Sequence, residues 1–124
     1  MSPVVIHTAT LSRAKRHIAQ NLHDANLTPA RIASAVHVSE PYLNRLFKAE
    51  DALSIMRYVW VQRLELAMDI LQRDVNGSAH IGDIAYMCGF STYAHFSRAF
   101  KKRYGVSPKE VTAARRLQDD TRSS

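Results

Sequence analysis

The sequence predicts an all-α protein with about seven helices, grouped into two helix-turn-helix subdomains joined by a long linker helix. One observation is the helical spacing of apolar residues, which is clearest in the run from Gly89 to Val111. There Phe96, Ala99 and Phe100 form one stripe, and small, polar and cationic residues occupy the opposite face. The other observation is that this pattern occurs twice along the chain.

The internal repeat relates positions that lie 52 or 53 residues apart. Ile84 lies 52 positions after Ile32, whereas Phe100 lies 53 positions after Phe47. The difference predicts one additional residue in the turn of the second copy. Because the repeat preserves both the buried stripe and the outward face, it indicates two copies of one working unit. The matched outward pairs are Pro41 and Ala94, Asn44 and Ser97, Arg45 and Arg98, and Lys48 and Lys101.

Each copy is predicted to contain a short helix, a tight turn and a second helix. Thr28 and Pro29 start the short helix of the first copy, since threonine caps a helix and proline suits its first turn. The turn of the second copy contains Gly89, which adopts a positive φ at little cost. The second helices are expected over residues 39–50 and 92–103. A helix with one apolar face and one small, polar and cationic face can lie in the major groove of DNA.

The remaining segments complete the expected organisation. Residues 1–10 lack periodicity and are expected to be disordered or a linker, before a first subdomain of residues 11–53 whose first helix covers 11–22. Residues 54–74 form the linker helix, which is apolar on two sides. Its length of ~30 Å is close to the ~34 Å between major-groove segments one turn apart.

The second subdomain is expected over residues 75–116 and the tail over 117–124. A polar hinge at residues 75–78 opens the second subdomain. Ser107, Pro108 and Glu110 predict a capping box at the start of the last helix. The tail is polar and is expected to be disordered.

Composition limits the core, the partners and the compartment. With 124 residues and 46% apolar content, the chain can bury one or two small helical cores. The 17 Lys and Arg against 11 Asp and Glu give a formal charge of +6, which favours polyanionic partners. The single cysteine excludes an intrachain disulfide. A cytoplasmic protein is expected, because no apolar run has the length of a membrane span and the N-terminus lacks a signal-peptide core.

We expect no cofactor, no metal site and no enzyme activity. The six histidines show no ligand spacing, and no nucleophile motif surrounds any serine or histidine. Trp60 stands at helical core spacing, as do the methionines. Cys88, beside the turn glycine, is expected to be a small core residue rather than a redox sensor.

Three features resemble the AraC/XylS family of bacterial transcription regulators: the doubled unit, the RL..A..IL pattern from Arg63 to Leu71, and the run CGF…F.RAFKKRYGVSP. The resemblance covers about residues 11–116. It implies an all-helical DNA-binding domain whose two recognition helices enter adjacent major-groove segments. A sensor domain does not fit within 124 residues beside the doubled unit. Because family members commonly carry an N-terminal sensing and dimerisation domain, the resemblance implies that this chain is a C-terminal fragment without that sensor domain rather than a complete small regulator.

Two residues depart from the family pattern. Ala52 stands where glycine is usual, which predicts strain in the turn before Ser54. Val111 stands where tyrosine is usual, which predicts thinner packing near the C-terminus.

The resemblance also implies which residues meet DNA. Carried over by motif position, the base-edge contacts fall on Pro41, Asn44, Arg45, Tyr93, Ala94, Ser97 and Arg98. Arginine paired with guanine is the commonest specific contact, and asparagine can bridge adenine N6 and N7. Phosphate contacts are expected from Lys48, Lys101 and Lys102.

We therefore predict sequence-specific binding of double-stranded DNA, as all or part of a transcription regulator of a family that includes activators. RNA polymerase is a candidate further partner, and no membrane is expected. The alternative from another class is a helical protein-interaction module whose basic faces hold an acidic partner, although flat interfaces favour buried aromatic residues. RNA is a second alternative, although the deep, narrow groove of A-form RNA excludes a helix.

Overall fold

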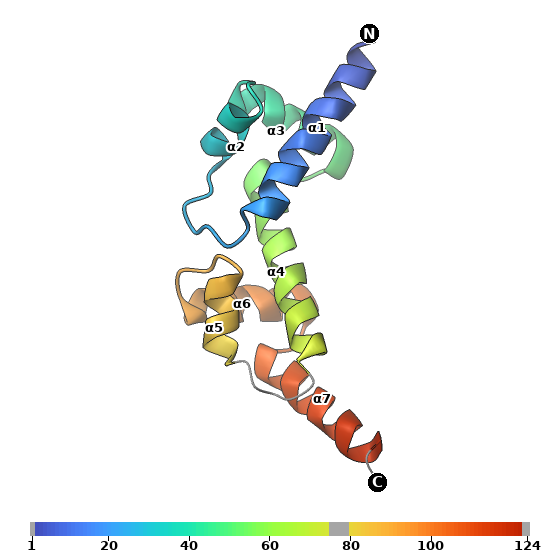
Figure 1. Ribbon diagram of the computed structural model, residues 1–124, viewed down its shortest axis with the longest axis vertical. Coiled ribbons are helices and arrows are strands. Elements are labelled where there is room, and N and C mark those ends of the chain that lie inside the picture. Colours follow the sequence, from blue (N-terminus) through green and yellow to red (C-terminus); the bar gives the residue numbers. More distant parts are fainter. Residues whose placement is uncertain (1, 75–79, 123–124) are drawn as a thin grey trace. The chain divides into compact units, whose positions relative to one another are not determined.

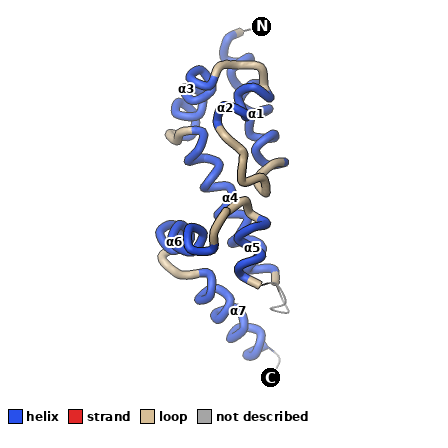
Figure 2. Tube along the Cα trace, turned by 90° about the vertical axis from the view of Figure 1, so that its left-hand side faces the viewer, coloured by secondary structure: helices blue, strands red, loops and turns tan. Residues whose placement is uncertain are grey.

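The computed structural model describes residues 2–74 and 80–122, and these residues form helices joined by turns, without a strand (Figure 1, Figure 2). The all-α prediction is therefore confirmed. The predicted hinge at 75–78 lies outside the described residues. The helices are α1 (Pro3–Gln20), α2 (Pro29–Ala35), α3 (Glu40–Asp51), α4 (Ile55–Arg73), α5 (Ile81–Met87), α6 (Tyr93–Tyr104) and α7 (Pro108–Arg122).

The chain divides into two units, Met1–Gln62 and Arg63–Ser124. The division falls inside α4, so this helix supplies its first half to one unit and its second half to the other. The sequence predicted two apolar sides for residues 54–74. One side is buried in the first half of the helix, which belongs to the first unit, and the other side is buried in the second half, which belongs to the second unit. Ile55 and Val59 are buried in the first half, and Leu64, Ala67 and Leu71 in the second.

Both ends of the chain are more helical than the sequence predicted. The expected linker at 1–10 is wrong, because α1 begins at Pro3. The Oγ atom of Ser2 accepts a hydrogen bond from the backbone N–H of Val5 at 3.4 Å, and proline occupies the first turn. At the other end, α7 continues through the expected tail to Arg122. No glycine or proline follows Pro108 to end that helix.

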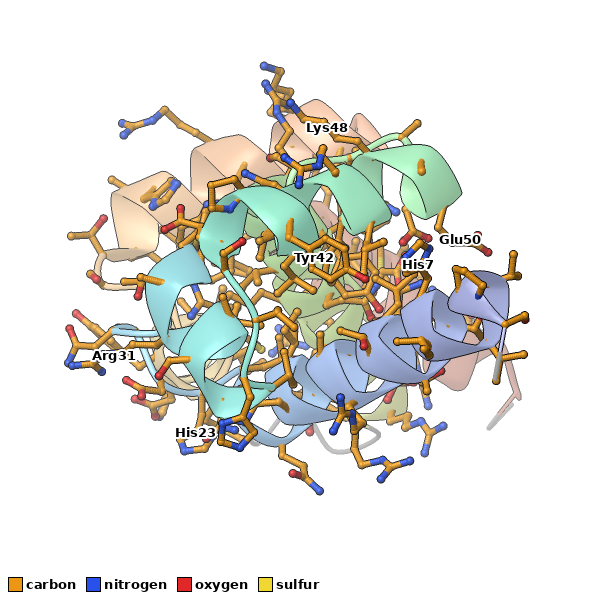
Figure 3. All side chains as sticks on the ribbon, turned by 90° about the horizontal axis from the view of Figure 1, so that it is seen from above. His7, His23, Arg31, Tyr42, Lys48 and Glu50 are labelled. Atoms are coloured by element: carbon orange, nitrogen blue, oxygen red, sulfur yellow. The ribbon has the colours of Figure 1, made fainter. Side chains whose placement is uncertain are left out.

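In the first unit, α1 packs against α2 and α3 (Figure 1). The core lies between these helices and the start of α4, and its fully buried side chains are Ala14, Ile18, Ile32, Leu43, Phe47, Ile55 and Val59. Lys15 of α1 joins the ends of two helices, since its Nζ lies 2.9 Å from the Asp51 carboxylate and 5.2 Å from the ring centroid of Tyr58. The N-terminal parts of α1 and α3 also contact each other through the rings of His7 and Tyr42. These rings point toward one another and meet edge to face, with their centroids 5.7 Å apart (Figure 3).

In the second unit, aromatic residues form a continuous core. The Phe96 ring centroid lies 5.1 Å from Phe90 and 5.6 Å from Phe100, which in turn lies 4.8 Å from Tyr104. Ile84 and Ala85 of α5 complete this core. Phe47 and Phe100, which the repeat pairs, are both fully buried, as predicted.

Packing near the C-terminus contains a surface hollow. The hollow has a volume of about 390 Å³ and lies between the end of α4 and the start of α7. Met68, Val106, Val111 and Ala114 are among its lining residues. Val111 is thus half-buried beside open space, which agrees with the thinner packing expected there. Within the described residues, no helix is both long enough and apolar enough to cross a bilayer.

Candidate nucleic-acid interface

The turns between the paired helices have the same backbone hydrogen bonds in both units. In the first unit the N–H of Val38 donates to the carbonyl of Ala33 at 3.1 Å, and in the second the N–H of Phe90 donates to that of Ala85 at 3.0 Å. His37 and Gly89 then occupy the same left-handed position, with φ of 61° and 87°. The predicted repeat therefore extends to the backbone geometry of the turn.

Hydroxyl caps start the second helix of each unit. Ser39 accepts a hydrogen bond from the N–H of Tyr42 at 3.3 Å, and Thr92 accepts one from the N–H of His95 at 3.2 Å. The additional residue of the second copy lies before Thr92, since the match changes from 52 to 53 positions between Phe90 and this cap. The caps fix where α3 and α6 begin, and hence which residues face outward.

We call the outward residues of α3 the first reading face: Pro41, Asn44, Arg45 and Lys48. Pro41, Arg45 and Lys48 are exposed, and Lys48 points away from the unit (Figure 3). Asn44 is half-buried, because it lies nearer the core. Leu43 and Phe47 occupy the opposite side of the helix and are fully buried.

The outward residues of α6 form the second reading face: Tyr93, Ala94, Ser97, Arg98, Lys101 and Lys102. The cations and Ala94 are exposed, and Ser97 is half-buried like Asn44, its counterpart. Tyr93 is also half-buried, with its ring centroid 6.3 Å from that of Phe96. Tyr93 therefore contributes to the core as well as to the surface.

The cations of the reading faces form no ion pair with any carboxylate whose side chain the structure describes, in residues 2–74 and 80–118. These cations are Arg45, Lys48, Arg98, Lys101 and Lys102. Arg103 differs, because its guanidinium lies 3.0 Å from the carboxylate of Glu65 on α4 and over the Tyr104 ring. The basic run of α6 thus divides into outward cations without a described carboxylate partner and one cation, Arg103, held within the unit.

Asn44 has a contact that the sequence did not predict. Its Oδ1 accepts a hydrogen bond from the backbone N–H of Ile55, the first residue of α4, at 2.9 Å. That N–H has no partner inside its own helix. In the second unit the equivalent position is Pro108, which has no N–H to donate. The sequence carries a signal for this contact. The first copy has asparagine where the second has Ser97, and the helix after it begins with Ile55 where the second copy has proline.

Cys88 lies in the core beside the second turn, as predicted. It is fully buried, and burial raises the pKa of its thiol to about 11, although the nearby Arg63 guanidinium lowers it. The thiol therefore stays protonated at neutral pH and has little nucleophilic character.

The fold and the duplicated basic faces define a DNA-binding domain with two helix-turn-helix units, of the kind that transcription regulators use. A family model described as a helix-turn-helix domain matches residues 32–114. An AraC-type DNA-binding protein from Chromobacterium violaceum has a similar structure, with a TM-score of 0.79 and 31% identity over 87% of this chain and 93% of that one. The chain belongs to this AraC-type helix-turn-helix family.

Further relatives agree with this family. The C-terminal domain of AraT, a response regulator from Geobacillus stearothermophilus, gives a TM-score of 0.77 with 31% identity over 91% of this chain and 86% of that one. The transcriptional activator NphR from a Rhodococcus species is 36% identical over 82% of this chain and 29% of its own length. The transcriptional activator RhrA from Rhizobium meliloti is 29% identical over 82% of this chain and 32% of its own. The chain thus spans less than a third of these two activators.

The fold has also been seen bound to DNA. The DNA-binding domain of AdpA, a global transcriptional factor, was solved in complex with a target DNA and gives a TM-score of 0.78. It covers 87% of this chain at 20% identity, so it shows the shared fold alone.

Proposed function

We propose that α3 and α6 each enter a major groove of one DNA duplex and read a specific site there. The observation that carries the proposal is the duplication of an exposed arginine and lysine at matched positions of two capped helices, Arg45 with Lys48 and Arg98 with Lys101. Two copies of one outward face suit a partner that repeats its own surface, as the duplex does every turn.

The base contacts that we propose come from both reading faces: Pro41, Asn44, Arg45, Tyr93, Ala94, Ser97 and Arg98. Arg45 and Arg98 are suited to guanine, because a guanidinium can donate to O6 and N7 together. The same arginine in both units cannot distinguish two half-sites. Specificity should therefore come mainly from the residues that differ between the faces, which predicts an asymmetric site with half-sites about 10 base pairs apart.

Phosphate contacts are proposed for the exposed lysines, Lys48, Lys101 and Lys102. A lysine is a compact charge on a flexible stem, which suits a phosphate better than a patterned base edge. These contacts would supply affinity for any duplex and would orient the helices on it.

The rest of the regulator is part of the proposal. The AraC-type relatives named as activators are about three times as long as the segment matched here. We infer that this domain works with a sensor domain outside the chain and acts on transcription through RNA polymerase. We propose the cytoplasm as the location of the domain, because the chromosome of a bacterium lies there.

Competition binding tests the proposal against the two alternatives. The chain is mixed with a labelled duplex taken from an in-vitro selection, and unlabelled random duplex, structured RNA or an acidic polypeptide is added. We expect the selected duplex to compete roughly 1,000-fold better than random duplex. Equal competition by random duplex or by RNA would contradict sequence-specific reading of DNA, and stronger competition by the polypeptide would favour a protein partner.

A further inference from the structure

The side-chain amide of Asn44 links the first reading face to the next helix. Asn44 lies on α3, and its Oδ1 accepts the N–H of Ile55 at 2.9 Å across a turn that contains Ala52. The assignment of the amide is fixed by this contact, because a backbone N–H can only donate and the atom facing it must be the oxygen. The amide nitrogen Nδ2 is therefore the end that does not face the N–H of Ile55.

The nitrogen end of the same amide is available. Nδ2 of Asn44 donates no hydrogen bond to any described side chain of residues 2–74 and 80–118 or to the described backbone, and it is not enclosed. Asn44 precedes Arg45, which is exposed on the same reading face. The amide therefore offers the outside a donor and keeps its acceptor for the protein.

Rather than the adenine bridge expected from residue type alone, we propose that Asn44 gives DNA only a hydrogen-bond donor, while its oxygen holds α3 against the start of α4. Bridging adenine N6 and N7 requires the amide oxygen and nitrogen to face the base edge together. In this structure the oxygen faces Ile55 instead. Asn44 would thus select a base with a hydrogen-bond acceptor, such as a purine N7, and its contribution to binding would not depend on the 6-amino group of adenine. This inference rests on the proposed function.

The second unit provides an internal comparison. Ser97 occupies the position of Asn44, and Pro108 that of Ile55. Proline fixes its own φ and leaves no N–H to satisfy, so the second unit needs no side-chain oxygen at this point. The difference between Asn44 and Ser97 is therefore explained by the helix that follows as well as by the base to be read.

Thermal melting without DNA tests the link to α4. Asn44→Ala removes the acceptor and should lower the Tm of the first unit by roughly 4 °C or more. Asn44→Asp retains an oxygen at the helix N-terminus and should melt near the wild-type temperature. Ser97→Ala is the matched control and should not shift the Tm. A wild-type Tm for Asn44→Ala would overturn the link.

Base analogues test the donor. The base pair at which Asn44→Ala loses preference in a selection is located first, and an adenine is placed there with either N7 replaced by carbon or the 6-amino group removed. Loss of N7 should weaken wild-type binding roughly 10-fold, and loss of the amino group less than 2-fold.

Two outcomes would overturn the inference. A 10-fold loss on removing the amino group would show that Asn44 bridges adenine, and a selection unchanged by Asn44→Ala would show that Asn44 contacts no base. If the wild-type chain preferred no duplex, the proposed function would be overturned. The melting experiment uses no DNA, so its result on the link between Asn44 and α4 would not depend on that outcome.

Discussion

Ala52 and Gly105 occupy the same left-handed backbone position in the two units. Ala52 follows α3 with φ of 58°, and Gly105 follows α6 with φ of 75°. Each donates its N–H to a carbonyl in the last turn of the helix before it, that of Lys48 and that of Lys101 respectively. Only glycine adopts this conformation without a steric penalty. The first unit therefore carries strain where the second does not.

Exchange of these two residues should shift stability in opposite directions. Ala52→Gly should raise the unfolding free energy of the first unit by about 0.5–1 kcal/mol, since relief of strain exceeds the entropy cost of glycine. Gly105→Ala should lower that of the second by about 1 kcal/mol through backbone strain alone, because an added Cβ meets nothing within 4 Å. Denaturant unfolding measures both changes. A loss of stability in Ala52→Gly would contradict the strain argument.

The buried phenylalanines should anchor their units equally. Phe47→Ala and Phe100→Ala each leave a large cavity in a fully buried site and should cost about 3–5 kcal/mol. Such a loss would unfold the affected unit, which thermal melting followed by circular dichroism would detect. The exposed Tyr86 is the control, and Tyr86→Ala should change stability by less than about 0.5 kcal/mol. Wild-type melting of either phenylalanine variant would mean that the repeat alignment is wrong.

Lys101 should contribute one phosphate contact. If about six phosphates are neutralised, log K should fall with log salt at a slope of roughly −5, and Lys101→Ala should reduce that slope by about one unit. The matched control is Arg73→Ala, since Arg73 is a cation already paired with Asp69 at 2.9 Å on α4. Weakening limited to the best site, rather than shared by all duplexes, would mean that Lys101 reads a base.

Cys88 should react slowly and should make stability depend on alkaline pH. Burial raises the pKa of its thiol to about 11, so labelling by a thiol reagent at pH 8 should be far slower in the folded chain than in denaturant. The folded pKa exceeds the unfolded one, so the thiol stabilises the fold below the unfolded pKa and this contribution is lost as pH rises toward 11. Cys88→Ala should lack that component of the pH dependence. Equal labelling rates in folded and unfolded chains would contradict the burial.

The core could be predicted from the sequence because its signals are local. Phe47, Phe100 and the residues around them recur at helical spacing, and the capping signals at Ser39 and Ser107 each act within one turn. The start of α1 was missed because no apolar stripe marks it. Val4, Val5 and Ile6 are 70%, 50% and 47% exposed, so they form no stripe although Ser2 and Pro3 start a helix there.

The site was only partly predictable, since some of its contacts join distant residues. Arg103 reaches Glu65 across 38 positions, and nothing local to α6 separates it from Lys102. Asn44 reaches Ile55 across 11 positions, after α3 has ended. Residue type alone indicates that arginine and asparagine can read bases, but their hydrogen-bond partners in the fold decide which atoms remain available.

In-vitro selection of duplex sites, carried out with the wild type, Arg45→Ala and Arg98→Ala, tests whether two unlike faces read one duplex. We expect an asymmetric wild-type site with two unlike half-sites about 10 base pairs apart. Each arginine variant should lose preference in one half only and retain it in the other, because the two faces belong to separate units. A palindromic site, or loss of preference in both halves from either substitution, would contradict the claim that two unlike faces read one duplex.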